Sequence, residues 1–230
     1  MSCINIHFKQ NLQQCIKIKS AVFVAFAILC QGFSPDYALG SKKTQTVLDR
    51  KVIRVRGPFI PSCGSDNPKL TVVVYSDCLC PKCYKVLRDL SAIAKKYKKI
   101  RIVYKELPVH GRLSLDCSAM ALVAHSQGKY WAFKASAEQY FKSMEEKPKA
   151  MPNCWTPAVR AGLDIKLAKQ TINSAAVVQE LKANFDEVMS LIPDPDTPVI
   201  VLGDTVIKGA LPKDKLDGII RQKLRLGLVL

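Results

Sequence analysis

Residues 75–83 read Tyr75-Ser76-Asp77-Cys78-Leu79-Cys80-Pro81-Lys82-Cys83 and contain a Cys-x-x-Cys pair. The preceding residues, Leu70–Val74, are mostly β-branched, which is typical of a strand buried on both faces. After the pair, apolar residues recur at helical spacing, at Val86, Leu87, Leu90, Ile93 and Ala94. Pro81 suits the first turn of a helix, where its missing N–H would have had no partner. The sequence therefore places both cysteines where a buried strand ends and a helix begins.

This position predicts redox chemistry at the cysteine pair. At a helix N-terminus, unpaired N–H groups and the helix dipole favour the thiolate form of Cys80. Cys83 lies one turn further along and can reach the same sulfur atom. Two such thiols exchange electrons with the disulfide of another protein through a mixed disulfide, in which Cys80 attacks and Cys83 resolves. We expect the reaction to need no cofactor.

Residues 1–40 are predicted to be a cleaved signal peptide. Three lysines precede the apolar segment 21–29, which is too short to span a bilayer but suits a secretory signal. Small residues then allow cleavage before Ser41. An uncleaved membrane anchor and lipidation at Cys30 are the alternatives. The mature protein is therefore expected in the periplasm.

The charge balance restricts the partners. The chain has 35 Lys and Arg against 19 Asp and Glu, and loss of residues 1–40 would remove three lysines and one aspartate, which changes the net charge from +16 to +14. Nucleic acid, anionic membranes and acidic proteins could each be attracted to such a chain. The lysines are scattered and accompany no nucleic-acid motif, so we expect no nucleic-acid partner.

The cysteine count fits an exported protein. Three of nine cysteines leave with the signal, and the six that remain could all form disulfides. Beyond the Cys80 and Cys83 pair, we favour a structural disulfide between Cys117 and Cys154, because both lie in a helical region. Cys63 and Cys78 would then be free or paired with each other.

The rest of the chain supplies an ordered set of elements. Ile100–Tyr104 is a second strand, parallel to the first in a βαβ unit. The expected organisation is an N-terminal tail with an edge strand at Lys51–Arg56 (residues 41–57), the βαβ unit with the cysteine pair (58–109), a helical insert (110–196), and a β-hairpin with a C-terminal helix (197–230).

This order of motifs resembles the DsbA-type branch of the thioredoxin superfamily. The resemblance rests on Tyr75-Ser76-Asp77, Cys80-Pro81-Lys82-Cys83, the run from Ser126 to Phe133, Thr197-Pro198 and Gly209-Ala210-Leu211-Pro212. It implies an α/β, thioredoxin-like fold, in which a mixed central sheet is flanked by helices and a helical subdomain is inserted between the βαβ unit and the C-terminal hairpin and helix.

The same resemblance implies a function and further site residues. The protein would be a monomeric, exported thiol:disulfide oxidoreductase that donates its disulfide to folding or partly folded proteins with cysteines and is reoxidised by a membrane partner. Pro198 would be a cis-proline facing the cysteines, and Thr197 would offer its backbone to an extended client segment. A disulfide isomerase or a reductase is the alternative within the same class.

Two residues depart from the family pattern. Lys82 places a cation between the active cysteines, and we expect it to lower the pKa of Cys80 and make the disulfide more oxidising. Cys78 extends the motif to Cys-x-Cys-x-x-Cys, so the alternative outside the oxidoreductases is a carrier of Cu(I) or another metal that uses Cys78, Cys80 and Cys83. We expect Glu106 to be a solvated loop carboxylate, and His110 and His125 to be surface or packing residues.

Overall fold

The computed structural model describes residues 53–146 and 151–226. These residues belong to one compact unit, Thr44–Leu230. The predicted signal peptide, its cleavage point before Ser41 and the alternative lipidation site Cys30 lie outside the described residues. Within the part of the chain that is described, no helix is both long enough and apolar enough to cross a membrane.

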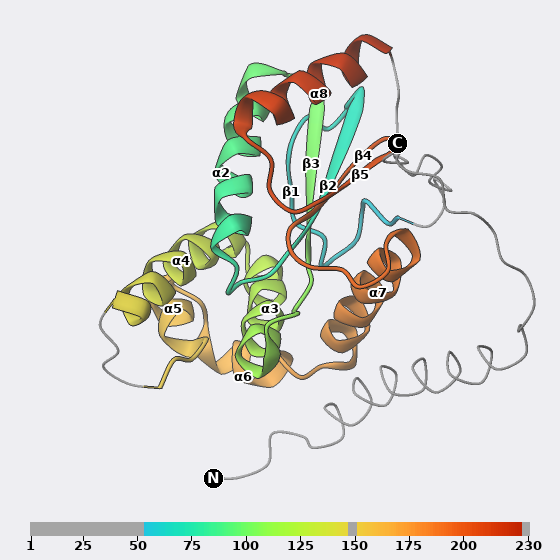
Figure 1. Ribbon diagram of the computed structural model, residues 1–230. Helices are drawn as coiled ribbons and strands as arrows, with labels where there is room; N and C mark the ends of the chain where they lie inside the picture. The colour runs from blue at the N-terminus through green and yellow to red at the C-terminus, as the bar shows by residue number, and fades with distance from the viewer. Residues whose placement is uncertain (1–52, 147–150, 227–230) are drawn as a thin grey trace, which may run out of the picture. The chain divides into compact units, whose positions relative to one another are not determined.

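A five-stranded mixed sheet forms the centre of this unit (Figure 1). Its strands are β1 (Ser62–Gly64), β2 (Leu70–Ser76), β3 (Ile100–Glu106), β4 (Val199–Leu202) and β5 (Thr205–Lys208), in the spatial order β1-β3-β2-β4-β5. β2 and β3 are parallel, as predicted for a βαβ unit, and the other neighbours are antiparallel. The predicted α/β class with a mixed central sheet is confirmed.

Helices cover the sheet on both faces and at one end. They are α2 (Pro81–Lys96), α3 (Gly111–Ser126), α4 (Tyr130–Glu146), α5 (Trp155–Arg160), α6 (Ile165–Thr171), α7 (Ala175–Leu191) and α8 (Lys213–Leu226). In Figure 1, α2 and α8 lie on one side of the sheet and α7 on the other, while α3 to α6 gather at the end where β2 and β3 finish. The five helices α3 to α7 all occur between β3 and β4, within the predicted insert.

One face of the sheet packs against α7. Alternate residues of a strand point to opposite faces, so this face is formed by Val73, Tyr75, Val103, Val199 and Val201. They pack with Val188 of α7 and with Ile53 and Ile60 from the segment before β1. The hydrophobic core therefore includes residues that precede the sheet in the chain.

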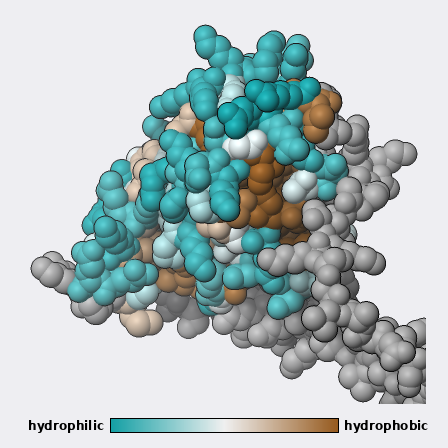
Figure 2. Space-filling model, turned by 45° about the horizontal axis from the view of Figure 1, so that its top comes forward, coloured by the Kyte–Doolittle hydropathy of each residue, from teal (hydrophilic) through white to brown (hydrophobic). Residues whose placement is uncertain are grey.

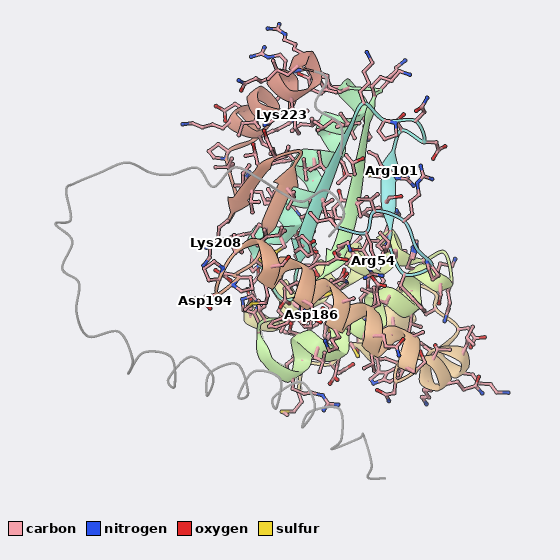
Figure 3. The ribbon with its side chains drawn as sticks, turned by 90° about the vertical axis from the view of Figure 1, so that its right-hand side faces the viewer. Arg54, Arg101, Asp186, Asp194, Lys208 and Lys223 are labelled. Atoms are coloured by element: carbon pink, nitrogen blue, oxygen red, sulfur yellow. The ribbon has the colours of Figure 1, made fainter. Side chains whose placement is uncertain are left out.

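Charged side chains join the same segment to α7. Arg54 donates to Glu180 at 2.9 Å and to Glu187 at 3.0 Å, and Figure 3 shows it beside this helix. Glu187 also receives the buried ammonium of Lys105 and the hydroxyl of Tyr75, the latter at 3.1 Å. Each buried charge thus has a partner of opposite sign, as burial in a low dielectric requires.

The predicted edge strand at Lys51–Arg56 is wrong over its described residues. Residues 53–56 form no strand, and the edge of the sheet is instead β1, whose Cys63 pairs with Ile102 of β3. Alternating hydrophobicity misled the prediction, because Ile53 is buried against the sheet face while Arg54 binds α7. Residues 53–56 therefore alternate between buried or half-buried apolar side chains and charged ones because of tertiary packing, without the backbone hydrogen bonds of a strand.

Polar contacts hold the C-terminal hairpin and helix to neighbouring segments. Lys223 of α8 binds Asp204 in the turn between β4 and β5, and Lys208 donates to the carbonyl oxygen of Asp194 at 2.7 Å.

Seen from the side that carries α8, the surface is mostly hydrophilic with smaller hydrophobic areas (Figure 2). Hydrophilic side chains therefore cover most of the surface on this side.

Candidate active site

Cys80 is the N-cap residue of α2 and lies at the predicted junction of strand and helix. Its backbone is extended, and its Sγ atom accepts a hydrogen bond from the backbone N–H of Cys83 at 3.2 Å. This N–H is one of those that a helix leaves unpaired in its first turn. The sulfur atom therefore takes the place of an oxygen-bearing capping side chain.

The two thiols differ in acidity. A hydrogen bond from the Cys83 thiol, assisted by Thr197 and by the charge of His110, outweighs burial and lowers the pKa of Cys80 to about 6. Burial, followed by the interaction with Cys80, raises the pKa of Cys83 far above its ordinary value. One thiol of the pair is thus a thiolate near neutral pH, whereas the other keeps its proton.

A distant loop completes the surroundings of the pair. The peptide bond between Thr197 and Pro198 is cis, as the resemblance implied. The Sγ atom of Cys80 lies 3.5 Å from the carbonyl oxygen of Thr197, and Pro198 accepts a hydrogen bond from the N–H of Gly209 at 2.8 Å. The structure therefore brings the predicted substrate-binding residues next to the predicted nucleophile.

Asp77 joins the cysteine loop to the start of α3. Its carboxylate is fully buried and accepts hydrogen bonds from the N–H of Leu79 at 2.7 Å and of Val109 at 2.8 Å. Ser114 and the ring of His110 are further donors to it. Burial opposes the charge of this carboxylate, but the hydrogen bonds outweigh it and lower the pKa of Asp77. A charged, fully bonded aspartate thus fixes the loop before Cys80.

Comparison with protein families decides the membership of this chain. The family model described as thioredoxin matches residues 60–222, which include both cysteines and the cis-proline. The chain belongs to the thioredoxin family. A comparison with curated protein sequences finds no match.

Solved structures agree with this thioredoxin-family assignment. A periplasmic thioredoxin-like protein from Salmonella enterica serovar Typhimurium is 24% identical, with a TM-score of 0.57 over 74% of this chain and 92% of that chain. A thioredoxin-like oxidoreductase from Silicibacter pomeroyi DSS-3 is 21% identical, with a TM-score of 0.63 over 74% and 94%. The thiol-disulfide exchange protein alpha-DsbA2 from Wolbachia pipientis is 20% identical, with a TM-score of 0.57 over 70% and 86%. The thioredoxin-like fold implied by the sequence is confirmed.

An ion pair lies in the interior of this thioredoxin-family protein, beside the cysteine loop. Glu106, at the end of β3, is fully buried and lies 3.2 Å from the ammonium of Lys134 on α4. Tyr130 donates to the same carboxylate at 2.7 Å. The expectation of a solvated loop carboxylate at Glu106 is therefore wrong, because β3 continues through residue 106 and α4 packs over its end.

Cys78 points into this ion pair. Its Sγ atom is 3.4 Å from the Lys134 ammonium and 3.6 Å from the Glu106 carboxylate. Burial and then the charge of Glu106 raise the pKa of Cys78 well above its ordinary value. Among the described residues, no three His, Cys, Asp or Glu side chains are placed to share a metal ion. The alternative metal cluster of Cys78, Cys80 and Cys83 is therefore not assembled in this structure.

The cysteines outside the active-site pair lie in different parts of the fold. All six described cysteines are free thiols. The interaction with Cys154, the N-cap residue of α5, raises the pKa of Cys117 on α3, so the two thiols lie near each other. Both are buried. Cys63 lies on β1 against Tyr104, whereas Cys78 contacts Glu106 and Lys134, so the two residues have different partners.

The sequence missed part of the electrostatic surroundings of Cys80. Lys82, expected to supply the positive charge, is exposed and is not among the main contributors to the acidity of Cys80. His110, expected to be a surface or packing residue, does contribute. The only sequence signal for it was its place directly after the second strand of the βαβ unit, at the same edge of the sheet as the cysteine loop.

Proposed function

We propose that this protein is an exported thiol:disulfide oxidoreductase that donates the Cys80–Cys83 disulfide to folding proteins. The observation that carries this proposal is the unequal acidity of the two thiols, with the pKa of Cys80 lowered to about 6 and that of Cys83 raised. A stabilised thiolate favours the reduced form of the pair, and a pair that is stable when reduced is a strong oxidant.

The reaction transfers two electrons from client to protein. A client thiolate attacks the Sγ atom of Cys80, the bond between the two active-site sulfurs breaks, and Cys83 leaves as a thiolate and takes up a proton. The second client thiolate then attacks the client sulfur in the mixed disulfide, and Cys80 leaves as a thiolate. The client gains one disulfide, and the protein ends with two reduced cysteines.

Cys83 and Cys80, both buried, differ as leaving groups in the two steps. A thiol of low pKa leaves faster than one of ordinary pKa. Cys80 is thus the better leaving group in the second step, which releases the client. The raised pKa of Cys83 means that this residue binds its proton as soon as it leaves, which prevents it from reclosing the disulfide at once.

The loop at Thr197 supports recognition of clients by their main chain. The N–H of Thr197 is bound by the carboxylate of Asp196 at 2.8 Å, and Asp196 is exposed. An extended client could replace this carboxylate and add its backbone to the loop, as in strand addition. Clients with different side chains around their cysteines would then bind in the same way.

The proposed function includes export to the periplasm and a membrane partner. The Salmonella relative is described as periplasmic, and residues 1–40 have the pattern of a secretory signal. A disulfide donor needs an oxidant after each turnover, so a membrane partner that accepts two electrons would complete the cycle. We propose that the protein acts as a monomer, because one chain supplies the cysteine pair and the Thr197–Pro198 loop.

The deciding experiment is the equilibrium between residues 41–230 and a glutathione buffer, with Cys80→Ser as the control that cannot form the disulfide. A potential of roughly −120 mV, the oxidising end of the range for this superfamily, supports a donor. A potential of roughly −270 mV would overturn the donor direction and favour a reductase. Absence of a redox transition at Cys80 and Cys83 would reject the oxidoreductase itself.

A further inference from the structure

Thr197 lies just before the start of strand β4. The pairing of β4 with β2 begins at Val199, opposite Tyr75, and the carbonyl oxygen of Pro198 accepts the N–H of Gly209 at 2.8 Å. Thr197 precedes these contacts in the chain. Its N–H and its carbonyl oxygen are therefore backbone groups that an added client strand could use.

Side chains meet both of these backbone groups when no client is bound. The N–H of Thr197 donates to Oδ1 of Asp196 at 2.8 Å, and the carbonyl oxygen lies 3.5 Å from the Sγ atom of Cys80. A client that reacts with Cys80 would replace the second contact as part of the reaction. The first contact is different, because Asp196 takes no part in thiol-disulfide exchange.

The Asp196 side chain holds the position that the main chain of a client would take. Asp196 is exposed, so the partner of this N–H lies at the surface, within reach of a client. A charged carboxylate is a stronger hydrogen-bond acceptor than a peptide carbonyl. It also satisfies an N–H group that would otherwise lose its partner. The carboxylate thus stabilises the empty loop, and a client must exchange this bond for a weaker one.

We propose that Asp196 is a specificity-determining residue that competes with the client main chain for the N–H of Thr197, and thereby weakens the binding of clients and speeds their release. The inference rests on the proposed function, since it names what limits the affinity of that same loop for clients. Small thiols have no main chain to add to the loop, so this competition does not affect them. Asp196 therefore reduces the preference for extended polypeptides over small thiols.

The test compares two reductants of the Cys80–Cys83 disulfide below saturation. One is an extended peptide with two cysteines, blocked ends and no charged side chains, and the other is dithiothreitol. Asp196→Ala removes the competing acceptor and should raise the ratio of the peptide rate to the dithiothreitol rate by roughly fivefold. Asp196→Asn keeps a neutral oxygen acceptor and should raise this ratio less.

Asp194→Asn is the matched control. Asp194 is in the same loop, where Lys208 binds its carbonyl oxygen and not its carboxylate (Figure 3). Asparagine removes the charge and tolerates the φ of 50° at this position. This variant should leave the ratio of the two rates unchanged.

The outcomes separate competition at Thr197 from other effects of the substitution. An unchanged ratio in Asp196→Ala, or an equal rise in Asp194→Asn, would overturn the inference. A rise that disappears at high salt would also overturn it, because salt screens repulsion over a distance but leaves a local hydrogen bond in place.

The direction of electron flow is tested separately. The same ratio can be measured in reverse, with the reduced protein and the disulfide forms of the peptide and of dithiothreitol. Exchange that runs only in reverse would reject the proposed donor function, while the effect of Asp196 is still measured. A protein that exchanges with dithiothreitol but with neither form of the peptide, in wild type and in Asp196→Ala, would overturn the inference.

Discussion

The Sγ atom of Cys80 lies 3.5 Å from the carbonyl oxygen of Thr197, although 117 positions separate the two residues in the chain. β2 and β4 are neighbours in the sheet, so the ends of these strands bring the cysteine loop and the cis-proline loop together. A client that adds its backbone at Thr197 would therefore present its sulfur to Cys80.

Replacing Cys83 by alanine should raise the pKa of Cys80. The Cys83 thiol provides the largest contribution to the acidity of Cys80, and alanine removes this donor while it leaves the backbone N–H in place. We expect a rise on the order of one pKa unit, measured by thiolate absorbance. The same variant should accumulate mixed disulfides with clients that carry a disulfide, because no resolving thiol is present. A titration unchanged from wild type would contradict the assigned hydrogen bond.

Replacing Thr197 by valine tests how the buried Thr197 hydroxyl, which has no hydrogen-bond partner among the described residues, affects the acidity of Cys80. Valine has nearly the shape of threonine but no hydroxyl group, and the Thr197 side chain is one of the contributors that lower the pKa of Cys80. The pKa should rise by less than in Cys83→Ala, and the Cys80–Cys83 disulfide should become less oxidising in a glutathione equilibrium. Thr205→Val, in a half-buried position of β5, is the matched control and should leave both quantities unchanged. A rise of equal size in the control would contradict the role of Thr197.

The stability of the reduced protein should depend on pH in a defined window. The pKa of Cys80 falls from its ordinary value near 9 to about 6 on folding, so the folded thiolate is favoured above pH 6. At pH 7 this contributes about 1.4 kcal/mol to the free energy of unfolding, and the contribution is lost as the pH falls through about 6. The oxidised protein lacks this titration. Thermal unfolding of the two forms between pH 5 and 8 should therefore show that the reduced form gains stability relative to the oxidised form as the pH rises. A difference that is constant with pH would contradict the low pKa.

Lys134→Met should destabilise the fold strongly. The substitution leaves the Glu106 carboxylate buried without its cation, and removal of one member of a buried ion pair costs roughly 3–5 kcal/mol. Urea unfolding of Lys134→Met, Glu106→Gln and the double variant should show that the second substitution recovers part of this loss. Lys142→Met, on the exposed face of the same helix, is the control and should change the free energy of unfolding by less than about 0.5 kcal/mol. Equal losses in the two methionine variants would contradict the buried pair.

Cys117 and Cys154 should form a disulfide in an oxidising compartment. The two thiols lie near enough for Cys154 to raise the pKa of Cys117, and closing the segment between them in the unfolded chain would stabilise the fold by about 4 kcal/mol. Peptide mapping of protein that has been exported to the periplasm of a bacterial host should find them joined, and buffers that reduce Cys80–Cys83 should leave this bond intact. Recovery of both residues as free thiols, or a bond from either one to Cys78, would contradict the predicted pair.

The order of elements could be predicted because its signals are local. The β-branched run before Tyr75, the position of Pro81 and the helical spacing after Cys83 each depend on neighbours within a few residues. The prediction of an edge strand at Lys51–Arg56 was wrong because it also relied on a local signal. An alternating pattern records which residues are buried, and at Ile53 burial came from packing on a sheet face instead of pairing at its edge.

The sequence by itself determined that a Cys-x-x-Cys pair begins a helix after a buried strand, and that this pair is suited to thiol-disulfide exchange. Only the tertiary structure decided which side chains surround the pair. Asp77 meets His110, Glu106 meets Lys134 and Cys78, and Cys80 meets Thr197. These contacts join residues from different elements, and they depend on strand order and helix packing. The acidity of a buried thiol depends on the charges and hydrogen bonds within a few ångströms of it, so this property was decided by the fold.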